Sequence, residues 1–224
     1  IGNGARGVVV ASPSTNVEIS NNVISGNGSL IALGGIQIQD AAVGTKVTSN
    51  IIGLSADGTI SIPNFGNGIT IDDNGGSAAT NSTIGGILAS EANTITGSTN
   101  YGVFINNAGV IGHKILGNAI YDNATGGISL SNGGNNAKPS PVITSATPTL
   151  ISGTCASGDV VEVFNDTPQS GITDQGRTFL GTATTTGTNW AFAGTFTLGN
   201  RITATATDNV NGTSEFANAV TITS

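Results

Sequence analysis

A phrase of glycine followed by alternating apolar residues recurs five times in the first 135 residues of this 224-residue chain. The copies are Gly7–Val10, Gly35–Ile38, Gly68–Ile71, Gly102–Ile105 and Gly127–Leu130. They recur at uneven intervals of roughly 25 to 34 residues. Self-similarity at such a period indicates a repeat architecture, here with turns of variable length.

Between these phrases lie two further short pieces per unit, each alternating with period two and bounded by Gly or Asn. They are Asn16–Ser20, Asn21–Asn27, Lys46–Ser49, Asn50–Gly53, Ser82–Gly86, Asn93–Gly97, His113–Gly117 and Asn118–Asn123. Such runs are typical of β-strands. Three strands per unit with no helix between them predict a parallel β-solenoid, whose coils stack about 4.8 Å apart.

Aligning the five phrases gives two inward columns that are entirely aliphatic. They are Val8, Ile36, Ile69, Val103, Ile128 and Val10, Ile38, Ile71, Ile105, Leu130. The outward column between them is mixed and comprises Val9, Gln37, Thr70, Phe104 and Ser129. Stacking would therefore build a core that one coil cannot bury alone. We expect Asn at the corners, because Asn tolerates left-handed geometry and its amide can bond its own backbone or the Asn of the next coil.

Composition excludes several classes of protein. Only 8% of the residues are charged, and 6 Lys and Arg stand against 13 Asp and Glu. Nucleic-acid binding needs a basic patch, which so few scattered cations cannot form. No apolar run approaches the ~20 residues that cross a bilayer, so we expect no membrane insertion. The single cysteine, Cys155, excludes a disulfide scaffold.

The coil phrases resemble those of the right-handed parallel β-helix repeat proteins of bacterial surfaces. The matching segments are Ser82–Gly86, Asn22–Asn27 and Asn67–Ile71, and Ile52–Gly68 is similar to an insertion common in that family. The resemblance covers about 60% of the chain. It implies an all-β fold in which residues 1–138 form a short right-handed parallel β-helix of about five coils.

A second domain is predicted over residues 139–224. Pro139 and Pro141 break the pattern and indicate a linker, because proline fixes φ and donates no ladder hydrogen bond. The candidate strands beyond it are Thr149–Gly153, Asp159–Asn165, Thr178–Thr184, Trp190–Ala193, Arg201–Thr207 and Ala219–Thr223. Turn residues between them predict a small antiparallel sandwich. Its expected core contains Trp190, Phe164, Phe179 and Phe192.

This second half resembles the bacterial immunoglobulin-like modules of large secreted proteins. The matching phrases are Ile151–Thr154, Val160–Phe164, Leu180–Ala183, Asn189–Phe192, Ile202–Asp208 and Thr213–Phe216. The most specific match is Ile202–Asp208 followed by Thr213–Phe216. The resemblance implies an Ig-like β-sandwich that acts as a spacer or adhesive stalk, with Cys155 where such modules carry a small residue.

Because β-helices host many polysaccharide lyases and hydrolases, we searched for catalytic constellations. Pectin hydrolases of this fold combine clustered aspartates with Gly-His-Gly and Arg-X-Lys. Here Asp72 and Asp73 are adjacent and Gly112-His113-Lys114 holds the only histidine, but no second Gly follows and no Arg-X-Lys occurs. We predict no catalytic residue and no enzyme activity, and interpret His113 as a solvated or strand-edge side chain. A polysaccharide lyase or hydrolase is the alternative.

The fifth aligned position carries Asp40 in one coil and Asp73 in the next. Stacked carboxylates repel each other unless they are hydrogen-bonded or bridged by a cation. One hypothesis is a weak calcium site formed by Asp40, Asp73 and Asp72, since Ca²⁺ prefers oxygen ligands. The alternative is a pair of solvated carboxylates at a bend. We predict no other cofactor.

Glycan binding would need exposed aromatic rings on which sugars can stack. Phe104 lies in the outward column, and Tyr101 and Tyr121 lie nearby at turns. These three residues are the candidate glycan contacts.

The preferred interpretation is a non-catalytic structural or adhesive protein that is secreted or displayed on the cell surface. The chain begins in mid-coil, so we expect either a preceding segment or another subunit to cover the first strand edges. The sharper hypothesis is head-to-tail self-association into filaments. Other surface proteins or polysaccharides are the further expected partners. The alternative function is a carbohydrate-active protein that binds or cleaves polysaccharide.

Overall fold

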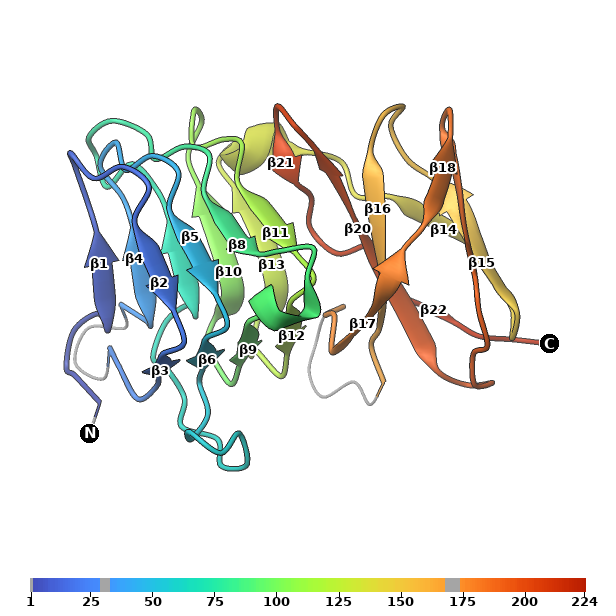
Figure 1. Cartoon of the computed structure of the whole chain (residues 1–224), viewed down its shortest axis with the longest axis horizontal. Coiled ribbons are helices and arrows are strands. Elements are labelled where there is room, and N and C mark those ends of the chain that lie inside the picture. The colour runs from blue at the N-terminus through green and yellow to red at the C-terminus, as the bar shows by residue number, and fades with distance from the viewer. Residues whose placement is uncertain (1, 29–32, 168–173) are drawn as a thin grey trace.

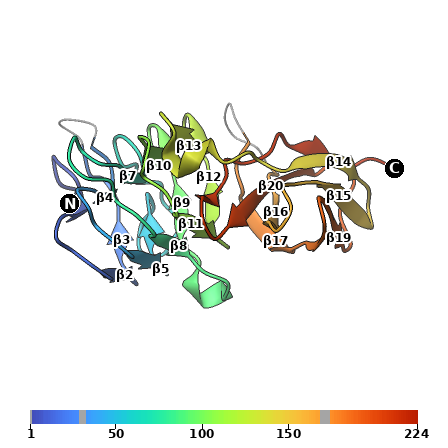
Figure 2. The ribbon, with the colours of Figure 1, turned by 90° about the horizontal axis from the view of Figure 1, so that it is seen from above.

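The structure is a computed structural model that describes residues 2–28, 33–167 and 174–224. It is an all-β protein with three parallel and two antiparallel sheets. Within the described ranges only two short 3₁₀ helices accompany the strands, η1 (Ala89–Glu91) and η2 (Gly134–Ala137). Figures 1 and 2 show the parallel sheets at one end of the long axis and the antiparallel sheets at the other. We call these the parallel region and the antiparallel region.

Each parallel sheet takes every third strand of the chain, so the backbone coils from sheet to sheet. The first sheet contains β1 (Val8–Val10), β4 (Ile36–Ile38), β7 (Ile69–Ile71), β10 (Tyr101–Asn106) and β13 (Gly126–Ser131). The second contains β2 (Glu18–Ser20), β5 (Lys46–Thr48), β8 (Thr83–Gly85) and β11 (Lys114–Leu116). The third contains β3 (Val23–Ile24), β6 (Ile51–Ile52), β9 (Thr94–Thr96) and β12 (Ala119–Tyr121).

The register of the first sheet confirms the predicted columns. Ile36 pairs with Val8 and with Ile69, and Val103 pairs with Ile69 and with Ile128. The inward residues of the middle coils are fully buried, because neighbouring coils cover them on both sides.

The outward column differs from the expectation at its centre. Gln37 and Thr70 are also buried, with only 3% and 8% of their surface exposed. The side-chain amide of Gln37 donates to Asp72 Oδ1 at 2.8 Å, and its oxygen accepts from Arg6 Nε at 3.2 Å. Polar side chains of adjacent coils therefore cover one another on this face.

Asparagine side chains stack along one corner of the coils. Asn22, Asn50 and Asn93 each donate both the backbone N–H and the side-chain amide to Oδ1 of the next asparagine, which is Asn118 at the last step. The distances lie between 2.8 and 3.2 Å. We call this row the asparagine ladder. It confirms the expected corner role of Asn, since it satisfies buried backbone groups that no strand pairing reaches.

The antiparallel region contains two sheets. One has the order β14 (Val142–Ala146), β15 (Leu150–Thr154), β19 (Asn189–Ala193), β18 (Thr184–Thr186). The other has the order β17 (Thr178–Thr182), β16 (Val160–Asn165), β20 (Arg201–Asp208), β21 (Gly212–Thr213), and β22 (Val220–Thr221) also pairs with β20.

The sequence prediction missed β14 and β21 and treated residues 178–184 as one strand. The structure divides that segment, because β17 pairs with β16 whereas β18 pairs with β19. The crossing between the sheets follows Gly181, whose φ of 148° is a conformation that favours glycine. Parallel strands end at Ser131 and antiparallel strands begin at Val142, on either side of the predicted boundary.

The core of the antiparallel region was predicted only in part. Trp190 is 2% exposed and lies in this core, and Phe192 packs against it. Phe164 instead contacts Phe179 and Phe216, with ring centroids 5.4 Å apart in both pairs. The reason is strand alternation, which turns Val161 and Val163 into the core and Phe164 to the other face of the sheet.

The antiparallel region covers the end of the last coil. Its Gln175 Oε1 accepts the backbone N–H and the amide of Asn123 at 3.1 and 3.2 Å. Glu162 Oε2 accepts from Gly117 N at 3.0 Å, and Thr213 Oγ1 accepts from Ile115 N at 2.8 Å. These side chains replace the acceptors that a further coil would supply.

Two more contacts strengthen this junction. Phe216 packs against the core of the parallel region. A Cβ on Gly127 would lie 2.6 Å from the Phe216 ring, so the close approach requires glycine there.

None of the helices in the described ranges is long and apolar enough to cross a membrane.

Candidate binding cleft at the junction of the two regions

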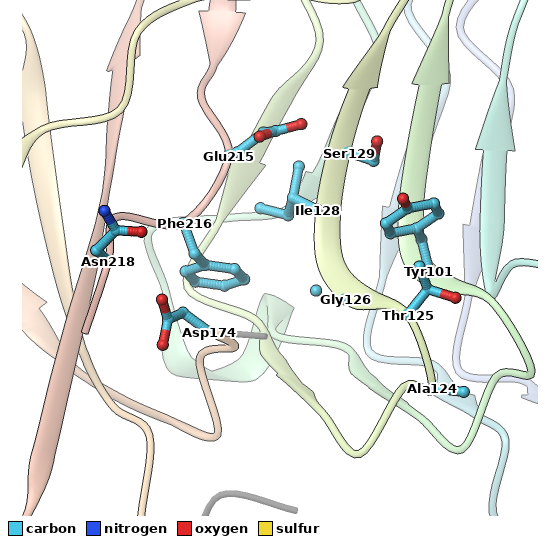
Figure 3. Close-up of a pocket in the computed structure, with 11 residues that line it drawn as sticks. Tyr101, Ala124, Thr125, Gly126, Ile128, Ser129, Asp174, Glu215, Phe216 and Asn218 are labelled. Carbon is cyan, nitrogen blue, oxygen red and sulfur yellow. The ribbon is translucent and has the colours of Figure 1, made fainter. Parts of the chain in front are cut away.

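A cleft of about 620 Å³ opens between the last coils and the antiparallel region. Its floor comes from β10 and β13, and its far wall is the segment Glu215–Asn218 before β22. Figure 3 shows Tyr101 on one side, Phe216 and Asn218 on the other, and Ile128 with Ser129 between them. The volume falls within the range of small-molecule binding sites.

Tyr101 and Phe104 form an aromatic pair on β10. Their ring centroids are 5.7 Å apart and the rings are inclined by only 18°. Tyr101 lies opposite Gly126 of the next coil, which supplies no side chain to cover the ring, and Phe104 lies opposite Ser129. The structure therefore brings two of the three predicted glycan contacts, Tyr101 and Phe104, together, and Tyr101 lines the cleft.

Tyr121, the third predicted contact, belongs to a different sheet. It lies on β12, and the guanidinium carbon of Arg177 sits 4.2 Å from the centre of its ring. Arg177 also forms an ion pair with Asp122. Tyr121 thus packs against the antiparallel region rather than lining the cleft with Tyr101.

Two carboxylates, Asp174 and Glu215, line the cleft, and among the described residues no Lys, Arg or His does. Glu215 Oε1 accepts from Leu130 N at 2.8 Å, at the outer edge of the last parallel strand. Asp174 Oδ1 accepts from Arg201. Both carboxylates therefore already hold structural hydrogen bonds, and each has a second oxygen.

Sequence reasoning missed Asp174, Glu215 and Phe216 as lining residues of a site. The phrase Thr213–Phe216 was noted for its resemblance, which was the only available signal. Nothing in the sequence indicated that this phrase faces Tyr101, because the two lie more than 100 residues apart and meet only through domain packing.

The three predicted calcium ligands have separate partners. Asp40 Oδ2 accepts from Gln39 Nε2 at 2.6 Å and lies near Asn74, whereas Asp73 Oδ1 accepts from Asn107 Nδ2 at 2.7 Å. Asp72 bonds Gln37, and burial raises the pKa of this carboxyl. Across the described ranges, no three His, Cys, Asp or Glu side chains gather in a way that could hold a metal. The calcium site stays a prediction.

His113 is not the solvated or strand-edge side chain that the sequence suggested, because it is completely buried. Its Nδ1 accepts from Ser82 N at 3.2 Å, so Nε2 carries the proton and donates to Ala79 O at 3.1 Å. Burial lowers the pKa of His113 to about 4. The imidazole is thus a neutral corner residue, and its two nitrogens satisfy two backbone groups of the preceding coil.

Lys138 is also buried, although the sequence placed it in a linker. Its Nζ lies 2.8 Å from both Asp159 Oδ1 and Asp208 Oδ2. Burial lowers its pKa, but these hydrogen bonds outweigh that effect and raise it overall. Cys155 is free and half-buried, and burial raises the pKa of its thiol. The two ion pairs of Lys138 hold the start of the antiparallel region in place.

Comparison of the chain with protein-family models and with curated proteins gives no match.

Proposed function

We propose that this chain is a non-catalytic structural or adhesive part of a secreted or cell-surface bacterial protein. In this proposal the parallel region is a short right-handed parallel β-helix, and the antiparallel region is an Ig-like sandwich that serves as a spacer. The junction carries the proposal. Gln175 binds Asn123 with the same amide geometry that joins one coil to the next. Because these hydrogen bonds fix the antiparallel region to the last coil, the two regions keep one relative orientation, as a stalk requires.

Small-angle X-ray scattering of the chain tests this rigidity. At concentrations where the protein does not self-associate, we expect a single rigid, elongated particle to fit the scattering profile. As a matched comparison, the double variant Gln175→Ala, Phe216→Ala removes the amide bond and the ring that join the regions. It should give a larger and more variable maximum dimension. A wild-type profile that requires a range of angles between the regions would contradict the proposal.

Self-association would extend this function. Among the described residues, β1, β2 and β3 have no strand on their outer side. A hollow of about 530 Å³ lies at this end of the molecule. Its lining includes Val9 and Val23, whose side chains are 49% and 47% exposed. Unpaired strand edges favour pairing with another chain. Because the antiparallel region covers the other end of the coils, a head-to-tail contact would join this edge to the antiparallel region of the next copy.

Sedimentation velocity and electron microscopy test self-association. We expect concentration-dependent assembly that Val9→Lys and Val23→Lys abolish, because a charge on the edge opposes pairing. Ile87→Lys is the control, because Ile87 is an exposed aliphatic residue on the side of the parallel region, between β8 and η1, and lies at neither end. Monomers at every concentration would reject self-association and leave the rigid-spacer proposal standing.

Carbohydrate binding is the second candidate function, favoured by the stacked Tyr101–Phe104 pair beside the cleft. Cleavage is not part of this candidate, since both lining carboxylates hold structural hydrogen bonds. Incubation with pectin and with alginate should release no product. Release of unsaturated or reducing ends by the purified chain would instead establish the lyase or hydrolase alternative.

A further inference from the structure

We propose that the junction cleft binds an uncharged oligosaccharide and discriminates against uronate chains, an inference that rests on carbohydrate binding as the function of the cleft. Three features support this proposal. They are the aromatic platform formed by Tyr101 and Phe104, the polar groups around this platform, and the negative charge at the wall of the cleft. Each is a property of the described residues.

The aromatic platform favours a ligand with flat apolar faces. Sugar rings present such faces through their axial C–H groups and stack on tyrosine and phenylalanine. Tyr101 lines the cleft, and its opposite position in the next coil is Gly126. The near-parallel packing on Phe104 holds the tyrosine ring in one orientation, so little side-chain entropy would be lost on binding.

The polar groups around the platform suit a ligand with many hydroxyls. The lining contains the hydroxyl of Ser129 on the floor of the cleft and the amide of Asn218 on its far wall. Glu215 uses Oε1 for Leu130 N, and its Oε2 accepts no hydrogen bond from the described residues. Sugars bind through such a mixture, because each hydroxyl can donate to a carboxylate and accept from an amide.

Charge at the wall discriminates among glycans. No cationic side chain of the part of the chain that the structure describes lines the cleft, and the chain carries a net charge of −7. Asp174 is paired with Arg201, whereas Glu215 has no ion-pair partner among the described residues. A uronate or sulfated chain would place its own negative charges against Glu215, where like charges repel. An uncharged oligosaccharide incurs no such cost.

Binding is measured by isothermal titration at low ionic strength with two sets of probes. The neutral set is cellohexaose, xylohexaose, mannohexaose and maltohexaose, and the acidic set is hexagalacturonate and an alginate hexamer. We expect at least one neutral hexasaccharide to bind about tenfold or more tightly than either acidic one. Tyr101→Ala should weaken neutral binding about tenfold, whereas Tyr101→Phe should keep most of it.

Tyr121→Ala is the matched control, because Tyr121 is an aromatic residue of the neighbouring sheet that Arg177 covers. It should change the affinity less than about twofold. Circular dichroism and the melting temperature of each variant establish that it is folded.

Glu215→Gln tests the charge argument directly. Glutamine keeps an oxygen that can accept from Leu130 N, but removes the charge. We expect it to raise affinity for hexagalacturonate about threefold to tenfold at low salt, and so to narrow the preference for neutral over acidic hexasaccharides.

The outcomes separate the two levels of the proposal. Tyr101-dependent binding of hexagalacturonate that is as tight as that of the best neutral probe, with no gain in Glu215→Gln, would overturn the ligand class while carbohydrate binding survives. Binding of no probe, or binding that Tyr101→Ala and Tyr121→Ala weaken equally, would overturn carbohydrate binding at this cleft altogether. Neither result bears on the rigidity measured by scattering.

Discussion

At the scale of single residues, His113 shows how one buried group makes stability depend on pH. The folded protein holds the imidazole neutral between Ser82 N and Ala79 O, with a pKa of about 4. In the unfolded chain its pKa is near 6.5, so the unfolded state takes up the proton first as the pH falls. The stabilisation is complete above pH 6.5 and is lost as the pH falls toward 4.

We therefore predict that His113→Gln flattens the acid limb of the stability profile. Glutamine can also accept from one backbone group and donate to another, but it does not titrate. Between pH 7 and 4.5 the wild type should lose roughly 2 to 3 kcal/mol more unfolding free energy than the variant. Urea denaturation at the two pH values measures this difference, and equal losses would show that His113 does not control the acid limb.

The buried carboxyl of Glu162 gives the stability of the protein the opposite dependence on pH. Burial raises the pKa of its carboxyl to about 7, although the hydrogen bond from Gly117 N partly offsets that rise. The folded state thus keeps a proton that the unfolded state releases near pH 4.5. Stability from this group is present at low pH and is lost as the pH rises from about 4.5 through 7.

Glu162→Gln should accordingly stabilise the protein at alkaline pH. The amide oxygen can still accept from Gly117 N, and no charge must be buried. Relative to wild type, the variant should gain roughly 2 to 3 kcal/mol of unfolding free energy between pH 5 and pH 8. Denaturant titrations at both pH values provide the measurement. A variant that is less stable than wild type at pH 8 would indicate that the ionised carboxylate is the form the junction needs.

At the scale of elements, the parallel strands are too short to hold themselves together. Most contain two or three residues, so each coil depends on its neighbours and on its corners. The asparagine ladder supplies those corners. Asn93 accepts two hydrogen bonds from Asn50 and donates to both Asn118 Oδ1 and Val47 O.

Asn93→Ala should lower the unfolding free energy by about 3 kcal/mol, because it leaves several buried polar groups without partners. Asn22→Ala is the comparison, since Asn22 is exposed at the end of the same ladder and receives no hydrogen bond from a preceding asparagine among the described residues. It should cost less than about 1 kcal/mol. Similar losses in the two variants would mean that the ladder does not stabilise the stack.

At the scale of the whole molecule, we expect the contacts at the junction to make the two cores unfold as one cooperative unit. Trp190, the only tryptophan, reports on the antiparallel core, whereas far-UV circular dichroism reports on all strands. We predict coincident thermal transitions by both probes for the wild type. The double variant Gln175→Ala, Phe216→Ala should separate them. Two transitions already present in the wild type would show that the regions unfold independently.

Much of the fold could be predicted because it depends on local periodicity. The columns through Ile36 and Ile38 follow from alternation alone, and the structure pairs them as predicted. The sheet change near Gly181 could not be predicted, since period two is the same whichever sheet a strand joins.

The candidate site divides in the same way. Tyr101 and Phe104 were predicted as surface aromatics and prove to be a stacked pair. Their partners across the cleft were not predicted, because no pattern relates residues that meet through packing of two separate regions.

The sequence alone determined the repeating unit, the inward columns and the corner asparagines, because each coil repeats the same local steric and hydrogen-bonding problem. Only the tertiary structure decided that the last coil is closed by Gln175, Glu162 and Thr213, and that this closure forms a cleft beneath Tyr101. The physical reason is that an unpaired backbone N–H can donate to any well-placed oxygen. Its partner is therefore fixed by the position of the whole antiparallel region and not by a local pattern.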